Sequence, residues 1–148
     1  MQIKFKKLHP NAKIPAYSKI GDAGMDLTAI SKNWSKSDGG YYCEYDTGLS
    51  VEIPEGYVGL IFPRSSQSNV NLLLTNHVGV IDSGFRGPIR FRFKKIIAGT
   101  ASVDLKTYEV GDRVGQLIIL PFPKIEPIEV DELSETTRGS GGFGSTGR

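Results

Sequence analysis

Hydrophobic and polar residues alternate with a period of two along several short stretches of the chain. Ile3 and Phe5 alternate with lysines, and residues 89–94 alternate Ile and Phe with Arg and Lys. Because successive side chains of an extended strand point to opposite faces, each stretch predicts a strand that is buried on one side. Two apolar runs, 59–62 and 117–120, predict further strands, and neither is long enough to cross a membrane.

Turn-forming residues separate these stretches at regular intervals. They fall at Gly21-Asp22, Asp38-Gly39-Gly40, Pro54-Glu55-Gly56, Asp82-Ser83-Gly84 and Gly111-Asp112. No amphipathic helical pattern of useful length appears, and only a short helical turn fits near residues 65–69. Many short strands without crossover helices predict one all-β domain, built as an antiparallel sandwich, jelly roll or barrel.

The composition is that of an ordinary globular domain. The chain has 148 residues, of which 39% are hydrophobic and 23% are charged, which is enough for one domain with a core. The net charge of only +2 argues against a polyanionic partner such as duplex DNA. Cys43 has no partner for an intrachain disulfide, and no apolar run follows Lys6 and Lys7 as it would in a signal peptide. We therefore expect a cytoplasmic protein, in the host cytoplasm if the source is viral, with no membrane contact.

The C-terminal end of the chain is rich in glycine and too polar to fold alone. Residues 121–135 carry prolines and acidic side chains, which predict an extended linker, and residues 136–148 follow as a mobile arm on a barrel core that spans 1–135. The arm contains Arg138, Phe143 and Arg148 together with hydroxyl groups. Guanidinium and hydroxyl groups suit phosphate oxygens and an aromatic face suits a planar ring, so the arm predicts closure over a nucleotide. Its linker is long enough to reach a neighbouring subunit.

Several motifs occur in a defined order along the chain. They are Ala23-Gly24-Met25-Asp26-Leu27, Pro63-Arg64-Ser65-Ser66, the stretch Asn76 to Gly87, Gly111-Asp112-Arg113-Val114-Gly115-Gln116, and the glycine-rich arm. Together they resemble the motifs of the trimeric deoxyuridine triphosphatase (dUTPase) family, and the resemblance covers about residues 20–148. It implies a distorted jelly-roll-like antiparallel barrel and a homotrimer with sites at the subunit interfaces. It also implies hydrolysis of dUTP to dUMP and pyrophosphate, which limits the incorporation of uracil into DNA.

Asp82 is the candidate general base. It stands where a predicted strand ends at a turn, and hydrolysis of a phosphoanhydride needs a carboxylate that orients and deprotonates a water. The resemblance assigns this role to Asp82, with attack on the α-phosphate. Phe85 stands where the family usually has Tyr. We expect its ring to pack on the deoxyribose and exclude a 2′-hydroxyl, while any hydrogen bond through a tyrosine hydroxyl is lost.

The resemblance places uracil recognition on the backbone of the hairpin that carries Asp82. Rigid amide and carbonyl groups there present hydrogen-bonding partners for the uracil edge and reject cytosine. Thymine is excluded because its methyl group does not fit. The implied residues are Asn76, Gly79, Val80, Ile81 and the main chain of Arg90.

Phosphate and metal binding are implied for the other motifs. The residues are Arg64, Ser65, Ser66 and Gln116 in the core, and Arg138, Phe143, Gly144 and Ser145 in the arm, where Phe143 offers its face to the base. Ser66 and Gly115 stand where the family more commonly has Gly and Ala. Asp26 is implied to reach a Mg²⁺ ion through water while the triphosphate supplies the direct ligands. His9 and His77 lack the spacing of metal ligands.

Two other functions remain open at this point. The related deoxycytidine triphosphate deaminases share the fold and the phosphate contacts, but they need a glutamate that activates water against the base, and none is evident near Asp82. The third reading is a regulatory or nucleic-acid-binding β-domain with an Arg- and Gly-rich arm, although the aromatic residues are not interleaved with the basic strand. Residues 31–45 and 95–108 are longer than the family minimum. Their aromatic side chains have two interpretations, a surface for an unknown protein partner or a cover for the sheet, and we expect the cover.

Overall fold

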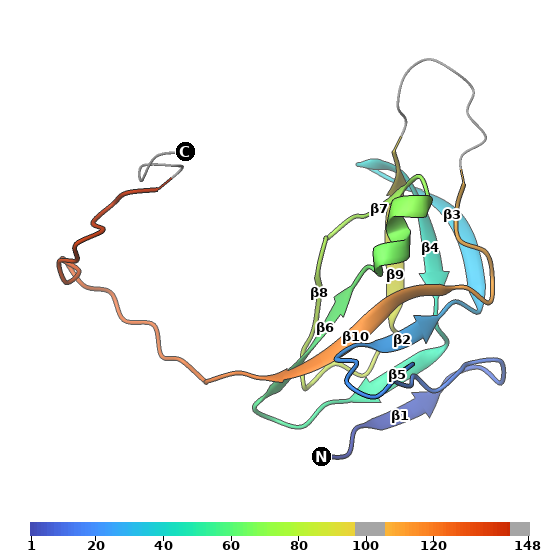
Figure 1. Cartoon of the computed structure of the whole chain (residues 1–148), viewed down its shortest axis with the longest axis horizontal. Coiled ribbons are helices and arrows are strands. Elements are labelled where there is room, and N and C mark those ends of the chain that lie inside the picture. Colours follow the sequence, from blue (N-terminus) through green and yellow to red (C-terminus); the bar gives the residue numbers. More distant parts are fainter. Residues whose placement is uncertain (97–105, 143–148) are drawn as a thin grey trace.

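Ten strands and one short 3₁₀ helix form the regular structure of the computed structural model, which describes residues 1–96 and 106–142 (Figure 1). Their bounds are β1 Lys4–Lys7, β2 Met25–Thr28, β3 Ser31–Ser37, β4 Gly40–Asp46, β5 Leu49–Glu52, β6 Tyr57–Phe62, η1 Ser65–Asn69, β7 Leu72–Leu74, β8 Gly79–Ile81, β9 Arg90–Lys95 and β10 Arg113–Pro121. The 3₁₀ helix η1 coincides with the helical turn predicted from the sequence, and β1, β6, β9 and β10 overlap the predicted strands. Within the described ranges, no helix has the length and apolar character needed to cross a membrane.

The strands pair into three antiparallel sheets. Two sheets have four strands each, in the orders β2-β10-β6-β8 and β3-β4-β9-β7, and β1 pairs with β5 in the third. Several neighbouring strands come from distant parts of the sequence, so the chain crosses repeatedly between the sheets. This confirms the all-β, jelly-roll-like single domain that the sequence predicted.

One hydrophobic core joins the two large sheets. Phe91 and Phe93 of β9 and Tyr45 of β4 are fully buried, and Leu27 and Leu117 of the other large sheet belong to the same cluster. The arginines and lysines that alternate with the phenylalanines of β9 are exposed. The period of two in the sequence is therefore also the period of burial.

Strand β6 lies inside the sheet that carries several of the candidate site residues. It lies between β10 and β8, and Gly79 of β8 pairs with Ile61. At the next position along β6, Phe62 pairs with Gln116 of β10, which in turn pairs with Asp26 of β2. Residues of three separate motifs are therefore brought to one end of a single sheet.

Residues 31–46 form a hairpin from β3 and β4. Trp34 and Tyr41 on this hairpin are 43% and 68% exposed. The Nζ atom of Lys95 lies 4.5 Å from the centroid of the Trp34 ring, and Nζ of Lys36 lies 5.8 Å from that of Tyr41. Lysine ammonium groups therefore lie near both rings. That the aromatic side chains of this segment cover the sheet stays a prediction, and residues 97–105 of the second long segment lie outside the described residues.

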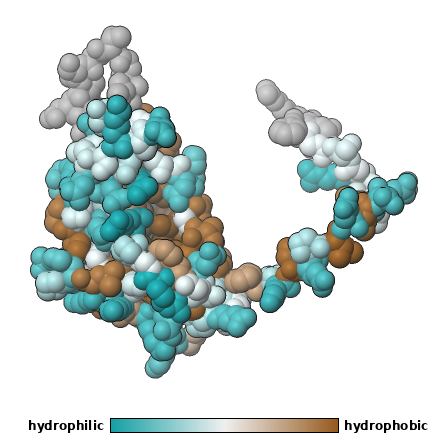
Figure 2. Space-filling model, turned by 180° about the vertical axis from the view of Figure 1, so that it is seen from behind, coloured by the Kyte–Doolittle hydropathy of each residue, from teal (hydrophilic) through white to brown (hydrophobic). Residues whose placement is uncertain are grey.

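After β10 the chain leaves the core as an extended arm, drawn in orange to red in Figure 1. Residues 122–142 contain no helix or strand. Figure 2 shows hydrophobic side chains along this arm, and the exposed ones are Phe122, Ile125, Ile128, Val130 and Leu133. The extended linker expected from the sequence is present, and it carries apolar side chains that its own core does not cover. Phe143, Gly144 and Ser145 lie outside the described residues.

Candidate active site

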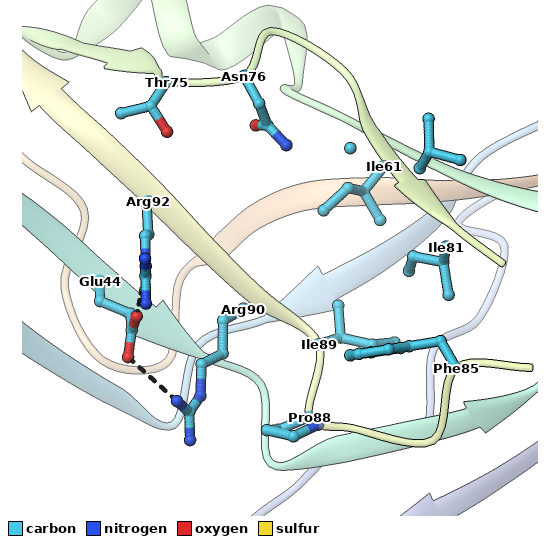
Figure 3. A pocket seen from close by; sticks show the side chains of 12 residues that line it. Glu44, Ile61, Thr75, Asn76, Ile81, Phe85, Pro88, Ile89, Arg90 and Arg92 are labelled. Carbon is cyan, nitrogen blue, oxygen red and sulfur yellow. Dashed lines mark hydrogen bonds and ion pairs between the residues drawn. The ribbon is translucent and has the colours of Figure 1, made fainter.

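A hollow of about 330 Å³, which we call the hairpin hollow, lies beside β8 and the segment that leads from it into β9 (Figure 3). Its lining consists of Glu44, Ile61, Thr75, Asn76, Gly79, Val80, Ile81, Phe85, Pro88, Ile89, Arg90 and Arg92. The structure thus brings together the residues of the core that are expected to recognise the base and the sugar. A concave, largely apolar surface with a few polar groups has the general character of a small-molecule site.

Gly79 allows β8 to lie close to β6. A Cβ atom at this position would overlap Cγ1 of Ile61 and would lie 2.7 Å from its Cδ1 and 3.2 Å from Nδ2 of Asn76. Since carbon atoms in contact are about 3.5–4.0 Å apart, a side chain at residue 79 would push β8 away from the sheet. The missing side chain leaves the Asn76 amide beside the backbone of β8, and Figure 3 shows that amide pointing into the hollow. An amide offers both donors and an acceptor to a planar base.

Asp82 and Phe85 lie on the turn at the rim of the hairpin hollow. Strand β8 ends at Ile81, and the amide of Phe85 donates to the carbonyl oxygen of Asp82 at 3.0 Å. The Asp82 side chain is exposed and does not line the hollow, and its carboxylate forms no hydrogen bond or ion pair with any residue in the described ranges. A carboxylate at the rim with no protein partner there is available to bind and orient a water molecule.

Sequence reasoning missed charged side chains in the lining of this hollow. Nε of Arg92 donates to Oε2 of Glu44 at 2.7 Å, and the guanidinium carbon lies 4.8 Å from the centroid of the Tyr42 ring. Nε of Arg90 donates to Oδ2 of Asp46 at 2.8 Å, so this guanidinium points toward β4. The main chain of Arg90 is the part of this residue that the sequence assigned to uracil recognition. The alternating pattern placed both arginines on one face, but it carried no signal that β4 is the strand opposite them.

A second hollow, of about 350 Å³, lies beside the start of η1, and we call it the η1 hollow. Its lining consists of Ser18, Asp22, Ala23, Gly24, Asp26, Arg64, Ser65, Gln116 and Ile118. It collects Asp26, Arg64, Ser65 and Gln116, which the sequence assigned to phosphate and metal binding. The hydroxyl of Ser66 is just behind them and accepts a hydrogen bond from Nη1 of Arg64 at 3.2 Å.

Asp26 holds two arginines in this hollow. Its Oδ1 accepts from Nε of Arg64 at 2.7 Å, and its Oδ2 accepts from Nη1 of Arg113 at 2.8 Å and from the Ser18 hydroxyl at 2.9 Å. Burial raises the pKa of Asp26, but the Ser18 hydroxyl and the two guanidinium groups outweigh it, so the pKa of this carboxyl lies below its ordinary value. Asp26 is therefore ionised at neutral pH and orients Arg64, whose other N–H groups can bind an anion.

Gln116 reaches the same hollow from β10. Its Nε2 donates to the carbonyl oxygen of Pro63 at 3.1 Å. A Cβ atom on Gly24 would overlap the Gln116 Oε1 atom and lie 3.0 Å from its Cδ, so this glycine leaves room for the amide. Arg113 was not expected as a site residue, and its position three residues before Gln116 in the same motif is the signal that would have found it.

The carboxylates of the η1 hollow fit a hydrated metal ion better than a directly bound one. In the described ranges, no three His, Cys, Asp or Glu side chains are grouped so as to hold a metal. The hollow offers Asp22 and Asp26, and both oxygens of Asp26 already accept hydrogen bonds. Such a set suits Mg²⁺ that keeps waters and takes direct ligands from phosphate oxygens. His9 and His77 are exposed and line neither of the two hollows.

The two hollows share no lining residue. Strand β8 borders the hairpin hollow and β2 borders the η1 hollow, with β6 and β10 between them. Three strand spacings of about 4.8 Å separate β8 from β2 by roughly 14 Å. Arg138 lies on the arm, where its Nε donates to the carbonyl oxygen of Gly141 at 3.0 Å, and the arm leads away from the core (Figure 1). Among the described residues, one chain therefore presents two separate hollows, and Arg138 lines neither of them.

Comparisons with known proteins relate this chain to one family of nucleotide hydrolases. The family model described as dUTPase matches residues 10–147. The chain is 40% identical to the deoxyuridine 5'-triphosphate nucleotidohydrolase of Helicobacter pylori (strain Shi470), over 99% of this chain and 97% of that protein. It is 39% identical to the protein of the same name from Escherichia phage T5, over 98% of each chain. Among solved structures, the dUTPase of Staphylococcus bacteriophage 80alpha with dUPNHPP has a TM-score of 0.82 and 28% identity, over 99% of each chain.

Proposed function

The chain belongs to the dUTPase family of nucleotide hydrolases, and we propose that it converts dUTP to dUMP and pyrophosphate at sites shared between subunits. The observation that carries the proposal is the separation of two complementary hollows. The hairpin hollow suits a nucleoside, and the η1 hollow presents arginine, serine and glutamine side chains that suit phosphates. A dUTP molecule needs both, so the hairpin hollow of one subunit would meet the η1 hollow of another in a homotrimer.

Uracil would lie against β8, where the backbone of Gly79, Val80 and Ile81 and the amide of Asn76 face the hairpin hollow. Hydrogen bonds to the uracil edge discriminate strongly, because a base with the opposite donors and acceptors would leave buried polar groups unpaired. The ring of Phe85 would lie against the deoxyribose and exclude a 2′-hydroxyl. Its exposed fraction of 44% leaves one face free for this contact.

Asp82 would act as the general base. Its carboxylate would accept a proton from a water molecule as the water oxygen bonds to the α-phosphorus. The bond from the α-phosphorus to the oxygen that bridges to the β-phosphorus would break, and pyrophosphate would leave with that oxygen. Support comes from the position of Asp82, exposed at the rim of the hairpin hollow and unpaired within the described ranges.

The triphosphate would bind Arg64, Ser65, Ser66 and Gln116. Asp26 neutralises part of the charge of Arg64 and fixes its direction, so an incoming phosphate would meet a guanidinium that is already oriented. When bound, Mg²⁺ would neutralise charge on the phosphate oxygens, and Asp26 and Asp22 are the carboxylates that would hold its waters. Asp26 would in that case share its oxygens with the two arginines.

The arm would close the site of a neighbouring subunit. Residues 122–142 extend away from their own core, which supports this reach. Arg138 would bind phosphate and Phe143 would stack on the base, with Gly144 and Ser145 beside the phosphates. We place the reaction in the cytoplasm, where it would supply dUMP and limit incorporation of uracil into DNA.

Incubation with each deoxynucleoside triphosphate and with UTP, in the presence of Mg²⁺, tests the proposal directly. We expect dUTP to yield dUMP and pyrophosphate, while dCTP, dTTP and UTP remain nearly unchanged. Release of ammonia from dCTP would identify a deaminase and contradict the proposal. Light scattering on the same sample should give the mass of three chains, and a fully active monomer would refute the shared site.

A further inference from the structure

Arg86 folds back over the turn that carries Asp82 and Phe85. Its Nη1 atom donates to the carbonyl oxygen of Ser83 at 2.6 Å and to that of Phe85 at 2.8 Å. Hydrogen bonds from a charged guanidinium are roughly twice as strong as neutral ones. One donor group therefore fixes two peptide units of the turn, on either side of Gly84.

The backbone of Arg86 is itself fixed to the core. Its carbonyl oxygen accepts a hydrogen bond from the hydroxyl of Ser50 at 2.7 Å, and Ser50 is a buried residue of β5 with 5% exposure. Shortly after, the amide of Ile89 donates to the carbonyl oxygen of Leu49 at 2.8 Å. Arg86 thus connects a rigid strand to a turn that is otherwise exposed.

The ring of Phe85 lies over the residue that follows Arg86. A Cβ atom on Gly87 would lie 2.6 Å from Cζ and 2.9 Å from Cε2 of this ring. Gly87 therefore provides the space in which the ring rests, and Figure 3 shows the ring beside Ile89 at the edge of the hairpin hollow. The guanidinium of Arg86 holds the carbonyl group of Phe85 in place. The backbone of Gly87, which has no side chain, sets how closely the Phe85 ring can approach it.

We propose that Arg86 is a positioning residue that sets the Phe85 ring at the height needed to reject a 2′-hydroxyl, and that it thereby determines selectivity for deoxyribose over ribose. This inference rests on the proposed hydrolysis of dUTP. Rejection of one hydroxyl depends on steric contact, and a displacement of about 1 Å is enough to change the fit of a bound substrate substantially. Loss of Arg86 therefore raises the turnover of UTP relative to that of dUTP. A purely structural role would instead lower the turnover of both substrates equally.

The experiment compares kcat/KM for dUTP and for UTP in the wild-type chain and in four variants. Arg86→Ala removes both hydrogen bonds, Arg86→Lys keeps the charge without the planar fork, and Gly87→Ala displaces the ring while Arg86 remains. Lys6→Ala is the matched control, because Lys6 lines the same surface hollow as Arg86 and its ammonium group bonds no described residue of the turn. We expect the ratio of dUTP to UTP efficiency to fall by about tenfold in Arg86→Ala and Gly87→Ala, partly in Arg86→Lys, and less than about twofold in Lys6→Ala.

Each other outcome has a definite meaning. Equal losses for both substrates in Arg86→Ala and Gly87→Ala would give Arg86 only a structural role and would overturn the inference, as would an unchanged ratio. If circular dichroism shows that Arg86→Ala does not fold, then Arg86→Lys and Gly87→Ala decide by the same ratio. A wild-type chain that does not hydrolyse dUTP would contradict the proposed function itself, which is a separate result.

Discussion

The ring of Phe91 occupies the space that a side chain on Gly115 would need. A Cβ atom at residue 115 would overlap Cε1 and Cζ of Phe91 and would lie 2.9 Å from the carbonyl oxygen of Phe62. Phe91 belongs to β9 and Gly115 to β10, so this contact joins the two large sheets. The fully buried phenylalanine ring thus fills the space beside a residue that has no side chain.

Gly115→Ala should destabilise the fold. The added methyl group has no free volume, since one of its neighbours is backbone and the other is a fully buried ring. Insertion of a methyl group into a well-packed core costs about 1–3 kcal/mol. Urea denaturation should therefore show a lower free energy of unfolding by this amount, and the double variant Gly115→Ala with Phe91→Leu should lose less than the sum of the two single variants.

Gly39→Ala is the control for this prediction. A Cβ atom at residue 39 would lie 3.5 Å from Nζ of Lys94, which is ordinary contact, and it should change the free energy of unfolding by less than about 0.5 kcal/mol. If Gly115→Ala is as stable as the wild type, the sheets are able to move apart at this point and the packing argument is wrong.

Asp82→Asn should abolish most of the activity and leave nucleotide binding. The amide is nearly the same size as the carboxylate but cannot accept the proton of the attacking water, so kcat should fall by about a hundredfold or more. Stopped assays for pyrophosphate give kcat, and calorimetric titration with a non-hydrolysable dUTP analogue gives the affinity. Glu55→Gln, on the exposed turn between β5 and β6, should have no effect on either. Normal turnover by Asp82→Asn would place the base elsewhere.

Stability should depend on pH through Asp26. Its pKa in the folded protein lies below the ordinary value of 3.8, so folding stabilises the ionised form. This contribution is complete above the ordinary pKa and is lost as the pH falls through the lower native value. Below about pH 4, the free energy of unfolding should therefore fall more steeply in the wild type than in Asp26→Asn, which lacks the titrating carboxyl.

Asp38→Asn provides the comparison for the acid limb. Asp38 lies on the exposed turn between β3 and β4 and has no ion pair within the described ranges. Its removal should leave the slope of stability against pH unchanged. Identical slopes for the wild type and Asp26→Asn would mean that the bonds from Ser18, Arg64 and Arg113 do not persist in solution.

Much of the fold could be predicted from local sequence patterns. The signals for a strand or a turn are carried by residues that are neighbours in the sequence. The alternation in 89–94 specified a strand with Phe91 and Phe93 inward, and the residues at 65–69 specified a helical turn after β6. The same local signals placed Asp82 at the end of a strand. These features depend on side-chain periodicity and turn chemistry, which a single sequence contains.

The parts of the site that depend on long-range pairing were not predictable in the same way. Asp26 bonds Arg64 and Arg113, which are far from it in the sequence, and Glu44 lines the hairpin hollow only because β4 pairs with β9. No local pattern specifies which strands become neighbours. The contacts of Arg86 are local, but they depend on the direction of a flexible side chain that has several rotamers.

Truncation after Glu135 should leave the fold and the proposed trimer intact. Within the described ranges the strands all lie before residue 122, and residues 136–142 contribute nothing to the core cluster. Activity should nonetheless fall steeply, because an open site admits water and holds the phosphates loosely. Circular dichroism and light scattering check the first expectation and the pyrophosphate assay checks the second. A truncated chain with full activity would show that the arm has no part in the reaction.

Mixing two inactive variants should restore activity if each site takes Asp82 and the arm from different chains. The truncated chain keeps Asp82, and Asp82→Asn keeps the arm, so neither homotrimer has a complete site. When equal amounts are unfolded together and refolded, random association gives both parts to about a quarter of the sites. The activity of the mixture per site should therefore rise to about a quarter of the wild-type value. This is well above the summed activity of the two variants when each is refolded separately. If the mixture is no more active than that sum, then the arm closes over its own chain, and the extended course of residues 122–142 is not the one used in catalysis.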